Sequence, residues 1–202
     1  MTMPRIAADT VAEHVQQQEA AVVRAAAQLF AERGVNDVSL GDIAAEVGLA
    51  RNSLYRYFPD KAHIFAAWFR TELEPLQQLS EAIATGGGPA SERLDRWLML
   101  HLDYLVAPEH QAMMAAVTES ASLAEVVRDQ VGEGHRDLYA TLATIVGELA
   151  PAEDGAGPPH DVRVVTMLIA GLLRSAADLV ISGADHGTVA AELRRVSRSA
   201  AG

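Results

Sequence analysis

The sequence predicts an all-α protein of about nine helices, and three observations lead to this fold class. Ala and Leu dominate the hydrophobic half of the 202 residues, whereas runs of β-branched residues are short. Apolar side chains recur at the helical period through most of the chain. Glycine and proline residues separate these periodic segments at helix-length intervals. No segment has the alternating pattern expected of a strand.

The first predicted helix begins near Thr10, which has capping-box spacing to Glu13. We expect it to end at Gly34, because glycine readily adopts the left-handed conformation that terminates helices. The apolar stripe between these ends comprises Ala21, Val22, Ala25, Ala26, Leu29 and Phe30.

Two short helices are predicted next. Ser39 is the expected N-cap of the first, with Asp42 as its capping-box partner and Gly48 at its end. The second is predicted over residues 51–58 and stops before Pro59, because proline disfavours the helical conformation in the preceding residue.

Longer helices make up the rest of the prediction. Asp60 is expected to cap a helix that continues to about Ala84 and contains Pro75. The glycine-rich run 85–89 separates it from the later helices. Those helices are predicted over residues 91–106, 109–119, 122–150, 161–182 and 186–199, with Pro108 in the first turn of the second and a solvated loop at 151–159.

Charge is distributed unevenly along the chain, whose net charge is −11. Residues 1–64 carry 6 Lys and Arg against 8 Asp and Glu, whereas residues 65–202 carry 10 against 19. Most of the acidity therefore lies outside the N-terminal part. A nucleic-acid partner remains compatible with that part, and the acidic remainder would weaken non-specific binding.

Composition also restricts the location and the chemistry of the protein. The chain has no cysteine, which excludes disulfides, thiolate metal sites and cysteine nucleophiles. The longest apolar candidate for a membrane span, residues 164–181, is interrupted by Arg174 and Asp178. The N-terminus lacks an apolar core of signal-peptide length. We therefore expect a soluble, cytoplasmic protein with no membrane partner.

Residues 39–61 are the most informative segment of the chain. They predict two short helices separated by a glycine, and the second helix carries polar and aromatic side chains. Reading the major groove of DNA requires this combination of a short helix, a tight turn and a polar recognition helix.

The ordered motif in this segment belongs to a known pattern. It consists of Ser39, Ile43-Ala44, Gly48, Leu54-Tyr55-Arg56-Tyr57-Phe58, Asp60 and Lys61, preceded by Ala-x-x-Leu-Phe-Ala-Glu-Arg-Gly at 26–34. The segment resembles the N-terminal DNA-binding region of TetR/AcrR-type transcriptional regulators, over roughly a quarter of the chain. One position departs from the family pattern: Ala50 stands where a capping Ser or Thr is usual. Loss of such a cap costs about 1 kcal/mol of helix stability.

The resemblance implies a helix-turn-helix DNA-binding domain at residues 1–60 and an effector-binding and dimerisation domain at 61–202. The resemblance implies that the protein is a DNA-binding transcriptional regulator, with repression as the expected mode of regulation. Its homodimer would form through residues 161–199, bind a palindromic operator in double-stranded DNA, and be released by a small-molecule effector. Activation instead of repression stays open.

Seven side chains are candidates for contact with DNA. Arg can pair bidentately with guanine and Asn with adenine, Tyr can reach phosphates or stack, and side chains at helix N-termini can approach the phosphate backbone. The candidates are Ser39, Arg51, Asn52, Ser53, Tyr55, Tyr57 and Lys61.

Candidates for contact with an effector are the adaptable or amphipathic residues of the larger domain, since ligand pockets are mostly apolar with a few polar groups. They are Trp97, His101, Tyr104, Met113, Met114, Tyr139 and Met167. His101 and Tyr104 form the best polar pair, and ordinary core packing is the alternative interpretation of each residue. The acidic surface favours an apolar or cationic effector.

Two other classes of function fit the sequence less well. An enzyme is disfavoured because no His has a Glu three positions before it, as helical di-metal sites need, and no nucleophile or P-loop motif is present. We expect no catalytic residue, no metal and no cofactor. A helical interaction protein without DNA binding is supported by Ala50 and the acidic charge, and opposed by Leu-Tyr-x-Tyr-Phe and Lys61.

Overall fold

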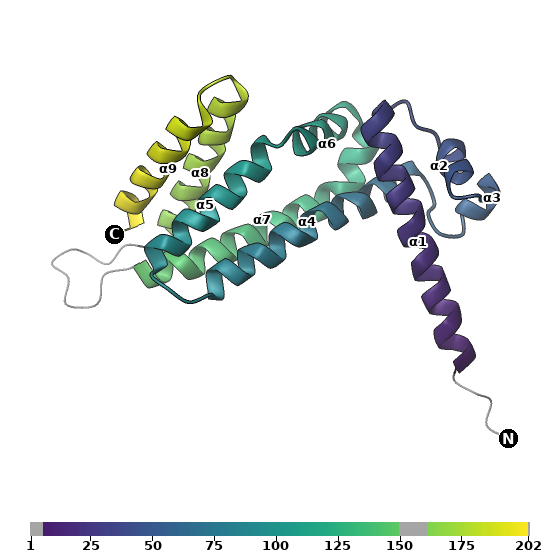
Figure 1. Ribbon diagram of the computed structural model, residues 1–202, viewed down its shortest axis with the longest axis horizontal. Coiled ribbons are helices and arrows are strands. Elements are labelled where there is room, and N and C mark those ends of the chain that lie inside the picture. Colours follow the sequence, from purple (N-terminus) through teal and green to yellow (C-terminus); the bar gives the residue numbers. More distant parts are fainter. Residues whose placement is uncertain (1–5, 150–160, 202) are drawn as a thin grey trace. The chain divides into compact units, whose positions relative to one another are not determined.

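The computed structural model describes residues 6–149 and 161–201, which form nine α-helices and no strand (Figure 1). The predicted all-α fold class is confirmed. The contacts between residues divide the chain into two compact units. Unit 1 comprises Met1–Glu72 and Met113–Gln130, and unit 2 comprises Leu73–Ala112 and Val131–Gly202. The domain boundary expected after residue 60 stays a prediction.

Unit 1 contains the N-terminal helices. They are α1 (Ile6–Arg33), α2 (Leu40–Glu46), α3 (Arg51–Leu54) and the first part of α4 (Lys61–Thr85), with the end of α6 (Pro108–Glu119) and the start of α7 (Ala121–Leu149). In Figure 1, α2 and α3 lie beside the C-terminal half of α1, whose N-terminal half runs clear of them.

The ends of α1 and α2 follow local sequence signals. Gly34 has a φ of 79°, and its amide donates to the carbonyl of Phe30 at 2.9 Å, so it ends α1 as predicted. Ser39 and Asp42 form the predicted capping box at the start of α2. The predicted start of α1 at Thr10 is wrong, because the helix already begins at Ile6.

The third helix is shorter than predicted. Regular α-helix ends at Leu54 instead of continuing over 51–58. The amide of Tyr57 donates to the carbonyl of Leu54, three residues back, at 3.0 Å, so the chain tightens into turns before Pro59. Ala50 stands at the N-cap and makes no side-chain capping bond.

Apolar packing in unit 1 centres on three aromatic rings. The centroids of Phe30 and Phe65 are 6.1 Å apart, and Trp68 lies 5.7 Å from Phe30 and 5.4 Å from Phe65, edge-on to the latter. Ile43 of α2 and Leu54 of α3 are completely or almost completely buried. The two short helices are therefore held by single large apolar side chains.

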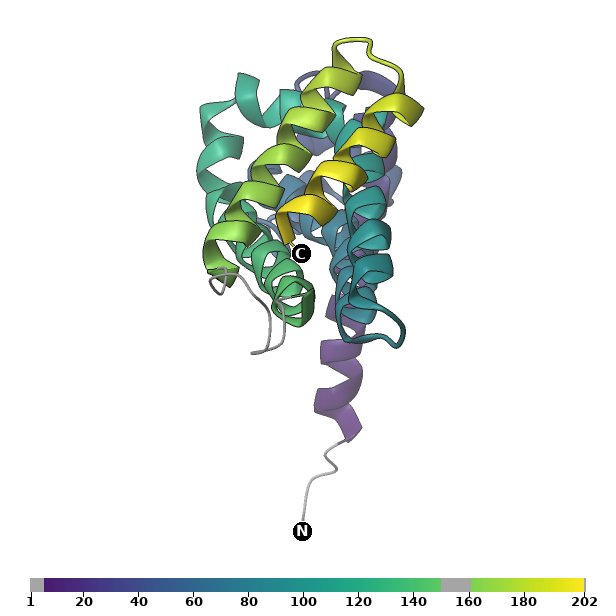
Figure 2. The ribbon, with the colours of Figure 1, turned by 90° about the vertical axis from the view of Figure 1, so that its left-hand side faces the viewer.

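Unit 2 has its own core. Its helices are α5 (Ala90–Val106), α8 (Val162–Ile181) and α9 (His186–Ala201), together with the later part of α4, the start of α6 and most of α7. A short turn with Gly183 at a φ of 101° reverses the chain between α8 and α9, which lie side by side (Figures 1 and 2). Trp97, Leu98, Leu142 and Ile169 are fully buried here.

Polar interactions align α5 with its neighbours. Arg93, which is 3% exposed, pairs with Glu148 of α7 and donates to the carbonyl of Ala84 at 2.6 Å. At the two ends of α9, Arg198 pairs with Asp95, and the imidazole of His186 lies 2.9 Å from the carboxylate of Asp103. Predicted loop residues 151–159 lie outside the described part of the chain.

Helix α8 has an unusual composition. Within the described ranges it is the one helix long and apolar enough to cross a membrane by length and composition, although 33% of that window is buried. The core helix of a water-soluble protein passes the same test. Its exposed surface also includes Arg163, Arg174 and Asp178.

We predict opposite effects of two glycine substitutions in the second helix and its turn. Gly48 has a φ of 68°, so Gly48→Ala forces an L-residue into the left-handed region and lowers the free energy of unfolding by about 1 kcal/mol. Gly41 lies inside α2 with room for a methyl group, so Gly41→Ala raises stability by about 0.5–1 kcal/mol. Urea unfolding followed by circular dichroism measures both. Equal effects would contradict the conformational argument.

Candidate nucleic-acid interface

Helix α3 and the turn after it present most of the side chains predicted to contact DNA. Arg51 and Asn52 are exposed at the start of α3, and Tyr55 is 45% exposed. Ser53 and Tyr57 are half-buried. Five of the seven predicted contacts therefore share one short, accessible segment.

Two apolar side chains determine which face of this segment is accessible. Leu54 is 1% exposed and Phe58 is 9% exposed, and they are four positions apart. Arg51 and Tyr55 are exposed although these two anchors beside them are buried, so the Arg51 and Tyr55 side chains face outward. The guanidinium of Arg51 makes a long contact of 3.5 Å with the Tyr55 hydroxyl. Such a face offers donors that can pair with base edges.

Ser39 is occupied within unit 1. Its hydroxyl oxygen accepts the amide of Asp42 at 3.2 Å, and the Asp42 carboxylate accepts the amide of Ser39 at 2.8 Å. Hydrogen bonds from Ser39 hold the pKa of the Asp42 carboxyl below its usual value. The immediate role of Ser39 is thus to begin α2.

Lys61 is also engaged inside unit 1. Its ammonium donates to the carbonyls of Val35 at 2.7 Å, Val38 at 2.9 Å and Asn36 at 3.4 Å. Partial burial lowers the pKa of Lys61, and the charge of Asp37 opposes this effect. All three carbonyls belong to the loop between α1 and α2. The ammonium therefore ties the start of α4 to that loop.

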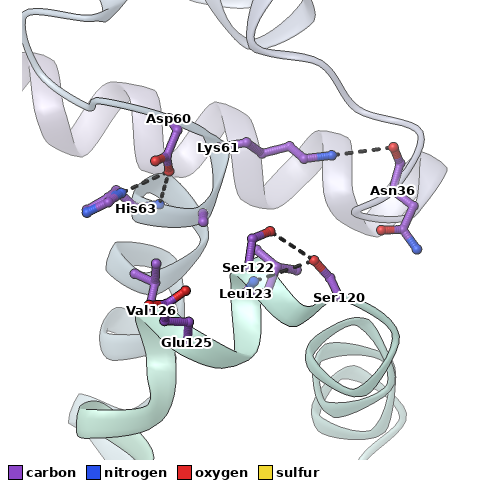
Figure 3. Close-up of a pocket in the computed structure, with 10 residues that line it drawn as sticks. Asn36, Asp60, Lys61, His63, Ser120, Ser122, Leu123, Glu125 and Val126 are labelled. Atoms are coloured by element: carbon purple, nitrogen blue, oxygen red, sulfur yellow. Dashed lines mark hydrogen bonds and ion pairs between the residues drawn. The ribbon is translucent and has the colours of Figure 1, made fainter.

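A cavity of about 690 Å³ lies beside this tie (Figure 3). One wall comes from the start of α4, where Asp60 caps the helix by accepting the amide of His63 at 2.9 Å, as predicted. The Asp60 carboxylate also lies 2.8 Å from the His63 ring, and these contacts hold its pKa low despite partial burial. Ser120 and Ser122, from the start of α7 and the residue before it, form part of the other wall.

A second tie joins the α1–α2 loop to the end of α6. The side-chain amide of Asn36 donates to the carboxylate of Glu119 at 3.1 Å, although the two residues are 83 positions apart. The loop before α2 is therefore held from α4 and from α6. Both of these contacts lie within unit 1.

Comparison with known proteins identifies the segment. The model of the bacterial regulatory proteins of the tetR family matches residues 22–68, which include α2, α3 and the start of α4. The transcriptional repressor BepR of Brucella suis is 29% identical over 150 residues, 71% of this chain and 69% of BepR. Residues 22–68 therefore carry the DNA-binding region of the tetR family, with its helix-turn-helix. The chain is a DNA-binding transcriptional regulator.

Solved structures of low sequence identity share the fold. A TetR-family protein from Mesorhizobium loti matches with a TM-score of 0.69 and 16% identity, over 93% of this chain and 94% of that one. A regulator from Saccharomonospora viridis, solved in complex with choline, matches with a TM-score of 0.66 and 21% identity, over 91% and 95%. The tetR fold thus extends over nearly the whole chain.

The residues predicted to contact an effector fall into separate groups. Trp97 and His101 are buried and stacked on α5, with ring centroids 3.9 Å apart, and Tyr104 follows them on the same helix. Tyr139 is half-buried on α7, also in unit 2.

The three methionines lie elsewhere. Met113 is buried and Met114 half-buried in the part of α6 that belongs to unit 1. Met167 is 52% exposed on α8. The structure thus brings Trp97 against His101, whereas Met113 and Met114 belong to unit 1.

Several residues of these sites were not found from the sequence. Asn36 and Glu119 pair across 83 positions, and Ser80 contacts His101 across 21, separations at which no periodic signal operates. The contacts of Lys61 with three backbone carbonyls likewise cannot be predicted from a sequence pattern. In the described ranges, no three His, Asp or Glu side chains gather as a metal site.

We predict that Lys61 acts on DNA binding through the α1–α2 loop. Lys61→Met removes a charged donor from three carbonyls, so the free energy of unfolding should fall by about 1–2 kcal/mol. DNA affinity should fall at every salt concentration without changing the slope of log K against log salt. A phosphate contact would instead reduce that slope by about one unit. Anisotropy titrations across a salt series separate the two roles.

Proposed function

We propose that the protein is a homodimeric repressor that occupies a palindromic operator and leaves it when a small molecule binds unit 2. The observation that carries this proposal is the accessible face of α3 and its following turn, held by Leu54 and Phe58. Arg51 and Asn52 stand at the end of α3 that enters the major groove in helix-turn-helix proteins. We assign base contacts to these two residues and backbone contacts to Ser53, Tyr55 and Tyr57.

The structural engagement of Ser39 and Lys61 refines their roles. Both polar groups already bond within unit 1, so we propose that they position α2 and the α1–α2 loop. The positive end of α2 can still meet a phosphate through its backbone amides. Repression itself is proposed by analogy with BepR, whose name describes a transcriptional repressor.

Dimerisation is proposed through α8 and α9. Val164, Leu168 and Leu179 are 52%, 58% and 56% exposed, and their spacing places them on one side of α8. Gly171 lies between them with open space at its Cβ position, which would let a second helix approach closely. A twofold axis pairs such a face with its own copy. We therefore propose that a second copy, and not lipid, covers the apolar face of α8.

The effector is proposed to be an apolar or cationic small molecule bound in unit 2 near α5. The stacked rings of Trp97 and His101, both buried on α5, are the aromatic groups that such a ligand would meet. The similar fold from Saccharomonospora viridis holds choline, a cation. Binding would shift the dimer toward a separation of its two α3 helices that no longer fits the operator.

We predict that Arg51→Ala weakens operator binding by about 1–3 kcal/mol and relaxes base preference at one position of each half-site. Asn52→Ala should act similarly at a neighbouring position. Fluorescence anisotropy on DNA flanking the protein's own gene measures this, followed by site selection from random sequences. Arg70→Ala, another exposed arginine of unit 1, is the matched control. If the unaltered protein selects no sequence, the helical interaction protein becomes the better interpretation.

We predict that Leu168→Glu converts the dimer into a monomer, because it places a charge in the centre of the proposed interface. Leu79→Glu is the matched control: Leu79 is 52% exposed but lies on α4, so this variant should stay dimeric. Light scattering coupled to size-exclusion chromatography gives the mass of each. A dimeric Leu168→Glu protein would exclude this face of α8 as the interface.

A further inference from the structure

A buried imidazole in unit 2 has one nitrogen that the fold does not use. His101 is 3% exposed, and its ring lies nearly parallel to the indole of Trp97, with centroids 3.9 Å apart. The Trp97 indole N–H donates to the Thr141 hydroxyl at 3.0 Å. The His101 ring is therefore held in position by a neighbour that is itself hydrogen-bonded.

The contacts of Ser80 decide which His101 nitrogen carries the proton. The Ser80 hydroxyl donates to the Leu76 carbonyl at 2.7 Å, and its oxygen lies 3.2 Å from His101 Nε2. A hydroxyl has one proton, and the shorter contact to a group that can only accept takes it. Ser80 must then accept from His101, so Nε2 bears the proton and Nδ1 carries a bare lone pair.

The lone pair on His101 Nδ1 has no hydrogen-bond partner in the part of the chain that the structure describes. Buried polar atoms are almost always paired, and one that is not calls for an explanation such as a water or a ligand. Burial lowers the pKa of His101 to about 4, so the ring stays neutral near pH 7. His101 Nδ1 can therefore accept a hydrogen bond from an O–H or N–H group of a ligand.

A second imidazole nearby repeats this feature. Tyr104 follows His101 by three positions on α5, and its ring centroid lies 4.5 Å from that of His110 on α6. His110 Nδ1 is also buried without a partner, and burial lowers the pKa of this histidine too. All of these residues belong to unit 2. Aromatic rings and unused imidazole nitrogens therefore occur together along α5 and at the start of α6.

We propose that the effector is an aromatic or apolar molecule that donates an O–H or N–H hydrogen bond to His101 Nδ1. This inference rests on the proposed effector site and specifies its chemistry. Alcohols, phenols and amines satisfy the lone pair, whereas molecules that only accept hydrogen bonds leave it unpaired. A carboxylate ligand would place a second acceptor against Nδ1 and is therefore excluded.

Phenol and toluene test this preference, because they match in shape and differ in the hydroxyl donor. Each is titrated into ¹⁵N-histidine-labelled full-length protein without DNA, and the Nδ1 and Nε2 shifts of His101 are followed. Without ligand, Nδ1 should resonate as an unprotonated nitrogen. Phenol should bind about tenfold more tightly than toluene and shift Nδ1, since only phenol can pair with it.

Two variants separate the role of Nδ1 from general packing. In His101→Gln the side-chain amide can still donate to Ser80, but no atom replaces Nδ1, so the affinity for phenol should fall to that for toluene. In Ser80→Ala the restriction on the tautomer is removed while the imidazole remains, so the preference for phenol should decrease. The Trp97 fluorescence and thermal unfolding of each variant report its folding.

Each alternative result overturns the proposal. Equal affinities for phenol and toluene, no binding of either, or a phenol preference that survives in His101→Gln would show that Nδ1 holds a buried water only or contacts no ligand. Because this assay contains no DNA, its failure leaves the repressor proposal intact. Conversely, if the protein selects no operator, a preference for phenol that depends on His101 would still support the proposed ligand contact.

Discussion

The interaction on which the DNA-binding unit depends is the bond between one ammonium group and three carbonyls. Lys61 at the start of α4 donates to the loop that connects α1 with α2, and Asn36 of that loop pairs with Glu119 of α6. Backbone carbonyls that point inward in a loop are costly unless a donor reaches them. A single long side chain supplies that donor, so the loop that leads into α2 is fixed from α4.

The sequence predicted those parts of the fold whose signals are local. Gly34, the Ser39–Asp42 box and Asp60 act within four residues of where they stand, and the structure has each in its expected role. The end of α3 does not follow from the sequence, because helical periodicity cannot distinguish α-helix from the tighter turns that reach Pro59. The phosphate contact of Lys61 stays a prediction. Its three carbonyl contacts could not be predicted, since no pattern in a sequence reveals which carbonyls a side chain will approach in the folded chain.

The candidate effector residues show the same division. Trp97, His101 and Tyr104 share α5, so their proximity follows from helical spacing. Grouping the methionines with them rests on residue type alone and stays a prediction; Met167 is 52% exposed on α8. Burial of Arg93, Trp97 and His101 with directed hydrogen bonds costs desolvation energy but restricts how α4, α5 and α7 can pack. These buried polar groups therefore contribute more to the specific packing of α4, α5 and α7 than to the free energy of unfolding.

The short α3 has a thermodynamic consequence. Four helical residues without a side-chain cap gain little from their own backbone hydrogen bonds, so the segment depends on Leu54 and Phe58 for its order. The orientation of the DNA-contacting side chains is therefore set by the apolar core of unit 1. A loss of packing around Leu54 or Phe58 would release α3 locally, while the longer helices stay folded.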